Sequence, residues 1–117
     1  MSLELSLVAP VVLLLLFGVV QGALYYHART VALGAAQEGL RAARVEGGSP
    51  GAGERRARQF VADAGGEQVL GGLDVRTTGD PAGVRVSVTG RPLSLLPGVL
   101  APAVTQVAAG PRERFTP

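Results

Sequence analysis

Residues 5–28, LSLVAPVVLLLLFGVVQGALYYHA, decide the fold of this chain, because these 24 residues carry no charge when His27 is neutral. As a helix they would be ~36 Å long, against a bilayer hydrocarbon core of about 30 Å. The run from Val11 to Phe17 is apolar on every face, which a helix on the surface of a soluble protein does not tolerate. The sequence therefore predicts a transmembrane helix over residues 1–28, in contact with the lipid bilayer.

The two ends of this run favour a retained membrane anchor over a cleaved secretory signal. Tyr25 and Tyr26 fall where aromatic side chains meet lipid headgroups, and Arg29 follows them. A cleaved signal has a shorter apolar region preceded by basic residues, whereas here the residues before the run include Glu4 and no base.

The rest of the chain predicts a small α+β domain attached to the membrane helix. Helical spacing continues through residues 29–46, and a Gly-rich stretch at 47–53 predicts a flexible linker. Within residues 54–117, the pattern predicts a short amphipathic helix at 54–64 that ends at Gly65 and Gly66. Alternating apolar residues then predict strands at 73–78 and 84–89, joined by a turn at 80–83, and a third strand at 104–109. Residues 91–103 are Pro- and Leu-rich and are expected to be irregular or briefly helical, and the tail from Gly110 is expected to fray.

Composition excludes several classes of function. The net charge of +2 is too small, and the eleven arginines too scattered, to indicate a nucleic-acid partner. Cysteine is absent, which removes disulfides and thiolate metal sites, and the absence of lysine removes a phosphate-binding Walker loop. His27, the one histidine, is expected to be an interfacial side chain. We therefore expect a protein that is not an enzyme, with no cofactor, no metal and no small-molecule substrate.

A row of small residues lies along the predicted long helix. Gly18 and Gly22 form a GxxxG pattern, and Ala28, Ala32 and Ala36 continue at four-residue spacing. Small side chains let helix backbones approach closely, so the row is a candidate surface for helix packing within the membrane. In a chain this rich in Ala and Gly, such a row also arises by chance.

Glu4 is the candidate functional residue at the start of the apolar run. A carboxylate there needs water, a partner or a proton, because the free-energy cost of a charge rises with depth in the bilayer. It either stays among the headgroups, near the positive end of the helix dipole, or meets a positive group such as a neighbouring subunit's terminal amine. The residue type alone leaves both readings open.

The N-terminal string Ser2-Leu3-Glu4-Leu5-Ser6-Leu7-Val8-Ala9-Pro10, followed by the Val/Leu run, resembles that of TadE-like proteins. These are pilin-like minor components of tight-adherence (Tad, or Flp) pilus systems. The family pattern of a Glu, five residues, a Pro and an aliphatic run matches Glu4 and Pro10. Tyr25-Tyr26, residues 38–43 and Arg112-Glu113 also fit it.

The resemblance implies a pilin-like fold and a role in assembly. A prepilin peptidase would cut after a Gly ahead of the apolar segment and leave Glu4 as the fifth residue of the processed chain. Glu4 would then neutralise a neighbour's terminal amine, while Pro10 kinks the helix. The implied partners are other pilin-like subunits and the Tad inner-membrane assembly proteins.

The sequence departs from this pattern at its start, since neither a leader nor a cleavage Gly precedes Met1. Either translation starts further upstream, or the chain was trimmed, or this copy is not processed. Orientation depends on the same point. The basic residues after the span would place the C-terminal part in the cytoplasm by the positive-inside rule, whereas a basic leader would hold the N-terminus there.

These observations favour a non-enzymatic TadE-like minor pilin or pseudopilin of a Tad-type (type IVb) pilus or secretion machine. We expect a single pass through the cytoplasmic membrane, with the C-terminal domain extracytoplasmic and incorporation into a surface pilus open. The alternative is a membrane-anchored accessory interaction module that does not enter a filament. The two share one topology and differ over whether Glu4 is required for assembly.

Overall fold

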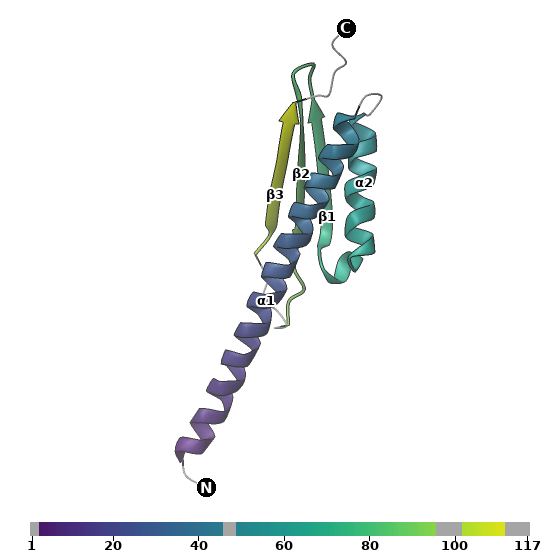
Figure 1. Cartoon of the computed structure of the whole chain (residues 1–117). Helices are drawn as coiled ribbons and strands as arrows, with labels where there is room; N and C mark the ends of the chain where they lie inside the picture. The colour runs from purple at the N-terminus through teal and green to yellow at the C-terminus, as the bar shows by residue number, and fades with distance from the viewer. Residues whose placement is uncertain (1–2, 46–48, 96–101, 112–117) are drawn as a thin grey trace.

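A computed structural model describes residues 3–45, 49–95 and 102–111 of the chain. The order is α1 (Leu3–Arg44), α2 (Pro50–Asp63), a short 3-10 helix η1 (Gly66–Gln68), β1 (Gly71–Gly79), β2 (Gly83–Arg91) and β3 (Val104–Pro111). The molecule is elongated, 81 × 19 × 19 Å, because half of α1 extends beyond the rest (Figure 1). The predicted α+β layout of a long apolar helix, a short helix and a small antiparallel sheet is confirmed.

Helix α1 is a single element of 42 residues that joins the apolar run to the predicted extension. Gly34 and Gly39, which lower helix propensity, lie inside it without ending it. Both face α2: the Phe60 ring lies where a Gly34 side chain would be, and Gly39 approaches the backbone at Gly53. Tertiary packing thus compensates for the weak local propensity.

The sheet has the order β1-β2-β3 with antiparallel pairing throughout. Val75 pairs with Val88, and Val86 pairs with both Thr77 and Ala108. The apolar residues that alternate in the sequence therefore lie on one face of the sheet. The inward face of the sheet is covered by α1 and α2, as Figure 1 shows, and it carries the buried side chains Val75, Val84, Val86, Val88 and Val104. The opposite face is largely polar.

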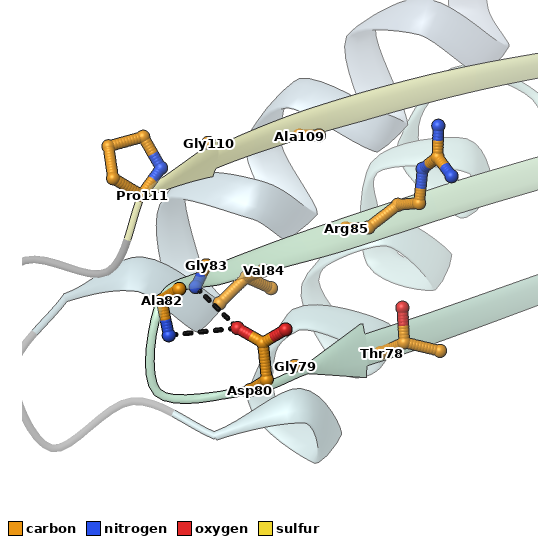
Figure 2. Close-up of a pocket in the computed structure, with 10 residues that line it drawn as sticks. All are labelled: Thr78, Gly79, Asp80, Ala82, Gly83, Val84, Arg85, Ala109, Gly110 and Pro111. Carbon is orange, nitrogen blue, oxygen red and sulfur yellow. Dashed lines mark hydrogen bonds between the residues drawn. The ribbon is translucent and has the colours of Figure 1, made fainter.

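The turn between β1 and β2 forms as the sequence predicts. The Asp80 carboxylate accepts hydrogen bonds from the backbone N–H groups of Ala82 and Gly83, both at 2.8 Å (Figure 2). The Asp80 N–H in turn donates to the Gly83 carbonyl at 2.9 Å. An aspartate at the first turn position therefore satisfies the turn backbone and fixes the hairpin register.

The prediction of a linker over residues 47–53 is wrong for its second half, because α2 begins at Pro50 and not at Glu54. Ser49 is its N-cap, and its side chain accepts from the Ala52 N–H at 3.1 Å. Pro50 occupies the first turn, where its missing N–H costs nothing. The Gly-rich composition concealed a good capping sequence; residues 47 and 48 lie outside the described residues.

Near the C-terminus, β3 ends at Pro111, two residues beyond the predicted end at residue 109. Gly110 pairs with Val84, and the Arg44 Nε donates to the Pro111 carbonyl at 2.8 Å. The expected fraying of the tail is therefore wrong for Gly110 and Pro111, which the last turn of α1 binds. Residues 112–117, including Arg112 and Glu113, lie outside the described residues.

The closest approach between the two helices is at Gly39 and Gly53. A Cβ atom on Gly53 would lie 2.8 Å from the Gly39 carbonyl oxygen and 2.9 Å from the Ala43 Cβ. A Cβ on Gly39 would lie 2.8 Å from the Gly53 carbonyl oxygen and 3.2 Å from a Val86 methyl. Glycine at both positions therefore sets the distance at which α2 packs on α1.

We predict that Gly53→Ala lowers the free energy of unfolding by about 1–3 kcal/mol, because the added methyl group pushes the backbone of α2 away from that of α1 in a packed interior. Gly51→Ala on the same helix is the matched control. Its Cβ has no contact closer than 3.4 Å, so it should be neutral or stabilise by up to ~1 kcal/mol. Denaturant titration of both full-length variants in detergent, followed by circular dichroism, measures the difference. Equal stability of the two would contradict the close approach.

Candidate assembly site on the N-terminal helix

The stem, which we define as residues 3–27 of α1, projects beyond the domain (Figure 1). Between Leu5 and Val20 it is apolar on every face apart from Ser6. Large side chains on all its faces are exposed, among them Leu3 at 84%, Leu7 at 68% and Val19 at 72%. None of its most apolar 18-residue window is buried, and α1 is long and apolar enough to cross a membrane. The stem fits a single-pass membrane anchor.

Glu4 lies in the first turn of α1, at the end of the stem furthest from the domain. Its side chain is exposed, and within the described part of the chain it has no ion-pair partner. The unpaired N–H groups of the first turn favour a negative charge there. A positively charged partner for the Glu4 carboxylate is therefore not found among the described residues of its own chain.

Pro10 lies two turns into the stem, and α1 continues through it. Because proline has no N–H, the Ser6 carbonyl lacks its usual partner four residues later. Gly18 and Gly22 are exposed, with nothing within 4 Å of the position a Cβ would take. These two glycines leave a flat, open strip on the stem.

The structure divides the predicted row of small residues. Ala28, Ala32 and Ala36 are fully buried against the chain's own domain, because the sheet and α2 cover α1 from Ala28 onward. These three alanines pack within the chain and are not available to a neighbouring membrane helix. Gly18 and Gly22 alone remain accessible for that purpose.

His27 is exposed, and among the described residues no three His, Cys, Asp or Glu side chains gather to hold a metal ion. A surface depression of about 660 Å³ lies at the hairpin tip, where the Asp80 carboxylate already binds the turn (Figure 2).

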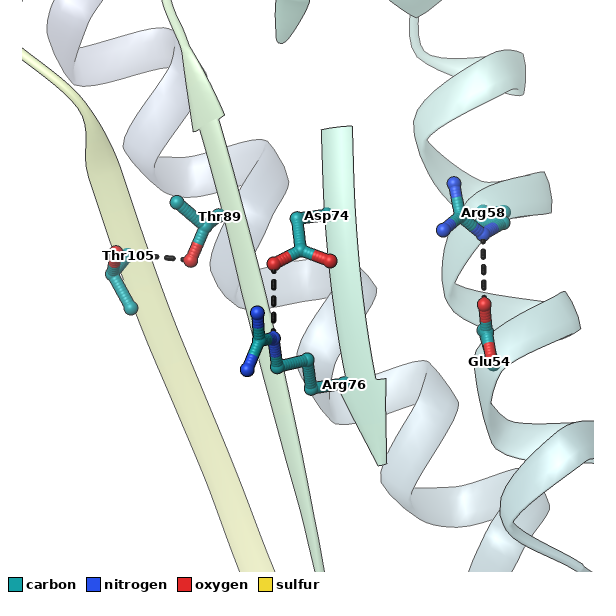
Figure 3. Close-up of polar contacts among 6 residues, drawn as sticks. All are labelled: Glu54, Arg58, Asp74, Arg76, Thr89 and Thr105. Atoms are coloured by element: carbon teal, nitrogen blue, oxygen red, sulfur yellow. Dashed lines mark hydrogen bonds and ion pairs between the residues drawn. The ribbon is translucent and has the colours of Figure 1, made fainter. Parts of the chain in front are cut away.

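Polar contacts elsewhere on the domain are local and exposed (Figure 3). Arg76 pairs with Asp74 at 3.1 Å, and the Thr89 and Thr105 hydroxyls are 3.1 Å apart. On α2, Arg58 pairs with Glu54 at 3.2 Å, and Arg56 lies 3.6 Å from Glu38 of α1. Exposed pairs of this kind contribute about 0–1 kcal/mol each, so they mark a solvated surface.

The TadE-like protein family model matches residues 1–41. The match confirms the resemblance drawn from the N-terminal residues, and it covers the stem and most of the remaining part of α1. No match was found among curated proteins or among solved structures. The matched segment is thus similar to TadE-like proteins, a family of pilus components that is not known for enzymatic activity.

Gln21 is a site residue that the sequence analysis missed. In the TadE-like segment its side-chain amide donates to the Leu93 carbonyl at 2.9 Å and accepts from the Leu95 N–H at 2.9 Å. It thereby joins the stem to the chain that follows β2, more than seventy residues away. The available signal was that Gln21 is the one amide side chain in the uncharged run.

We predict that Gln21→Leu increases the rate of hydrogen exchange at the Leu95 amide, because that N–H loses its acceptor. Exchange measured by NMR or mass spectrometry on the full chain in detergent micelles would show it. Gln37→Leu, at an exposed position on the same helix, should leave the Leu95 rate unchanged. Identical Leu95 rates in the Gln21 variant and the parent chain would contradict the contact.

Proposed function

We propose that the protein is a non-enzymatic minor pilin or pseudopilin that acts in assembly of a Tad-type pilus or secretion machine. One observation carries the proposal: the TadE-like match falls on a helix whose first half is exposed and apolar on all sides. A subunit that moves from a bilayer into a filament needs such a surface. In the bilayer lipid surrounds it, and in a filament the apolar stems of neighbours replace the lipid.

Glu4 supplies the specificity that an apolar stem lacks. Among lipid chains or packed stems the local dielectric is low, so an unpaired carboxylate is costly and a correctly placed cation is strongly favoured. A neighbour's terminal amine at the same depth satisfies this requirement in one axial position only. The unpartnered Glu4 carboxylate thus sets the stagger between adjacent subunits in the proposed filament.

Gly18, Gly22 and Pro10 complete the proposed packing surface. The open strip at the two glycines lets a neighbouring stem approach with its backbone close to α1. Pro10 leaves one stem carbonyl without an intrahelical partner, which permits local bending as the stem adapts to its neighbours.

The proposed location is the cytoplasmic membrane, with the domain extracytoplasmic. Its proposed partners are other pilin-like subunits, the Tad inner-membrane assembly proteins and, for processing, a prepilin peptidase. Orientation follows from a basic leader upstream of Met1, which would keep the N-terminus in the cytoplasm.

The first test of the proposal is Glu4→Ala at the native locus. We expect loss of assembled pili with an unchanged amount of the protein in the membrane fraction, because the apolar anchor stays intact. Glu67→Ala, which removes an exposed carboxylate from the domain, should assemble normally. Sheared surface pili and electron microscopy give the readout. Normal piliation in the Glu4 variant would instead favour an accessory module that never enters a filament.

The second test is N-terminal sequencing of the protein expressed from its native locus with the upstream DNA intact. We expect a processed chain that begins one residue ahead of Met1, which makes Glu4 the fifth residue. Deletion of the prepilin peptidase should return a longer chain. A terminus at Met1 in the wild-type cell would show that the chain is not processed and would make Glu4 the fourth residue, which contradicts the spacing that the Glu4 mechanism requires.

A further inference from the structure

The chain that leaves β2 descends along the stem instead of turning back across the sheet. Arg91 is the last residue of β2, and residues 92–95 follow it at the end of the sheet that lies nearest the stem (Figure 1). Both hydrogen bonds of the Gln21 amide end on this segment, at the Leu93 carbonyl and the Leu95 N–H. The 92–95 segment therefore reaches below the sheet to the level of Gln21.

The level of Gln21 can be placed relative to the bilayer. Tyr25, which marks the headgroup region, is one turn further along α1, so Gln21 lies ~6 Å closer to the membrane centre. On the other side, residues 3–20 form a length of ~27 Å, close to the hydrocarbon thickness of about 30 Å. Gln21 and the 92–95 segment thus lie where headgroups give way to acyl chains.

The chemistry of the segment suits that depth. The Leu93 side chain is 46% exposed although it is apolar, and Pro92 contributes no backbone N–H. The Gln21 amide satisfies one carbonyl and one N–H that would otherwise be costly at a lipid boundary. Arg29 and Arg91 are exposed; Arg29 lies ~12 Å further along α1 than Gln21, on the side of the domain, and Arg91 precedes Leu93 by two residues.

We propose that residues 92–95 form a second membrane contact, with the Leu93 side chain inserted among the lipids of the leaflet that faces the domain. The occupant of this surface is lipid, because the exposed Leu93 lies beside Gln21, directly above the exposed apolar residues of the stem. The contact holds the domain against the bilayer beside α1. It depends on the membrane anchor and not on the proposed pilus role, so either can fail without the other.

Tryptophan fluorescence tests the insertion, since the chain has no tryptophan of its own. Full-length Leu93→Trp is reconstituted in phosphatidylethanolamine–phosphatidylglycerol vesicles that contain phosphatidylcholine brominated near the carbonyl end or near the middle of its chains. We expect loss of about half the emission with bromine near the carbonyl end, as for a side chain at interfacial depth, and less with bromine at the middle.

Two matched variants calibrate the result. Val19→Trp, on the exposed stem, is the reference for a residue inside the bilayer, and Val107→Trp, 41% exposed on the outer face of β3, is the reference for one in water. Leu93→Trp emission that stays as unquenched as that of Val107→Trp would overturn the proposal. A neighbouring protein as the occupant would give that same unquenched result.

A smaller probe guards against disturbance by the indole ring. The chain has no cysteine, so Leu93→Cys carries a single nitroxide spin label in the same vesicles. Insertion predicts that oxygen, which partitions into lipid, relaxes the label more than a water-soluble nickel chelate does. The reverse order of accessibility would overturn the proposal independently of the fluorescence.

Discussion

The packing of α1 on the sheet through alanine and glycine is the constraint on which the rest of the structure depends. From Ala28 to Ala43 the buried side chains of α1 are mostly methyl groups or hydrogens, with Val31 and Leu40 as the larger exceptions. Each methyl contributes little, at about 0.8 kcal/mol per buried carbon. The stability of the domain therefore depends on a close approach that lets the larger valines of β2 fill the space against the helix.

Because the same helix forms the stem, the orientation of the domain relative to the membrane is set by α1. The backbone hydrogen bonds run without a joint from the bilayer segment into the core, and the one interruption, at Pro10, lies far from the domain. A tilt of the upper stem is thus a tilt of the domain. The Gln21 contacts add a second connection further along the same face of α1, since Gln21 lies seven residues before the buried Ala28.

Elements that follow from the spacing of apolar residues along the chain were predictable from the sequence. Contacts between residues that are far apart in the chain were not. Alternating valines predicted the two strands and their buried faces, and the length of the uncharged run predicted the stem. The start of α2 was missed because Gly51 and Gly53 read as a linker. Only the fold shows that Gly53 makes room for Gly39, and that the Gln21 amide has partners more than seventy residues away. Composition alone does not distinguish a glycine that makes a linker flexible from one that allows two helices to pack closely.

The TadE-like match ends at residue 41, within the last turn of α1. A sheet with valines on one face and a helix with small residues can be built from many sequences, so the domain constrains its residues weakly. The stem is constrained on every face, because each must suit lipid and, in the proposed role, a neighbouring stem. Between Leu5 and Val20 its one polar side chain is that of Ser6, so the apolar surface cannot by itself select a partner or an axial position. In the proposed role, selection then depends on the few residues that differ from this apolar surface: Glu4 by its charge, and Gly18 and Gly22 by their lack of a side chain.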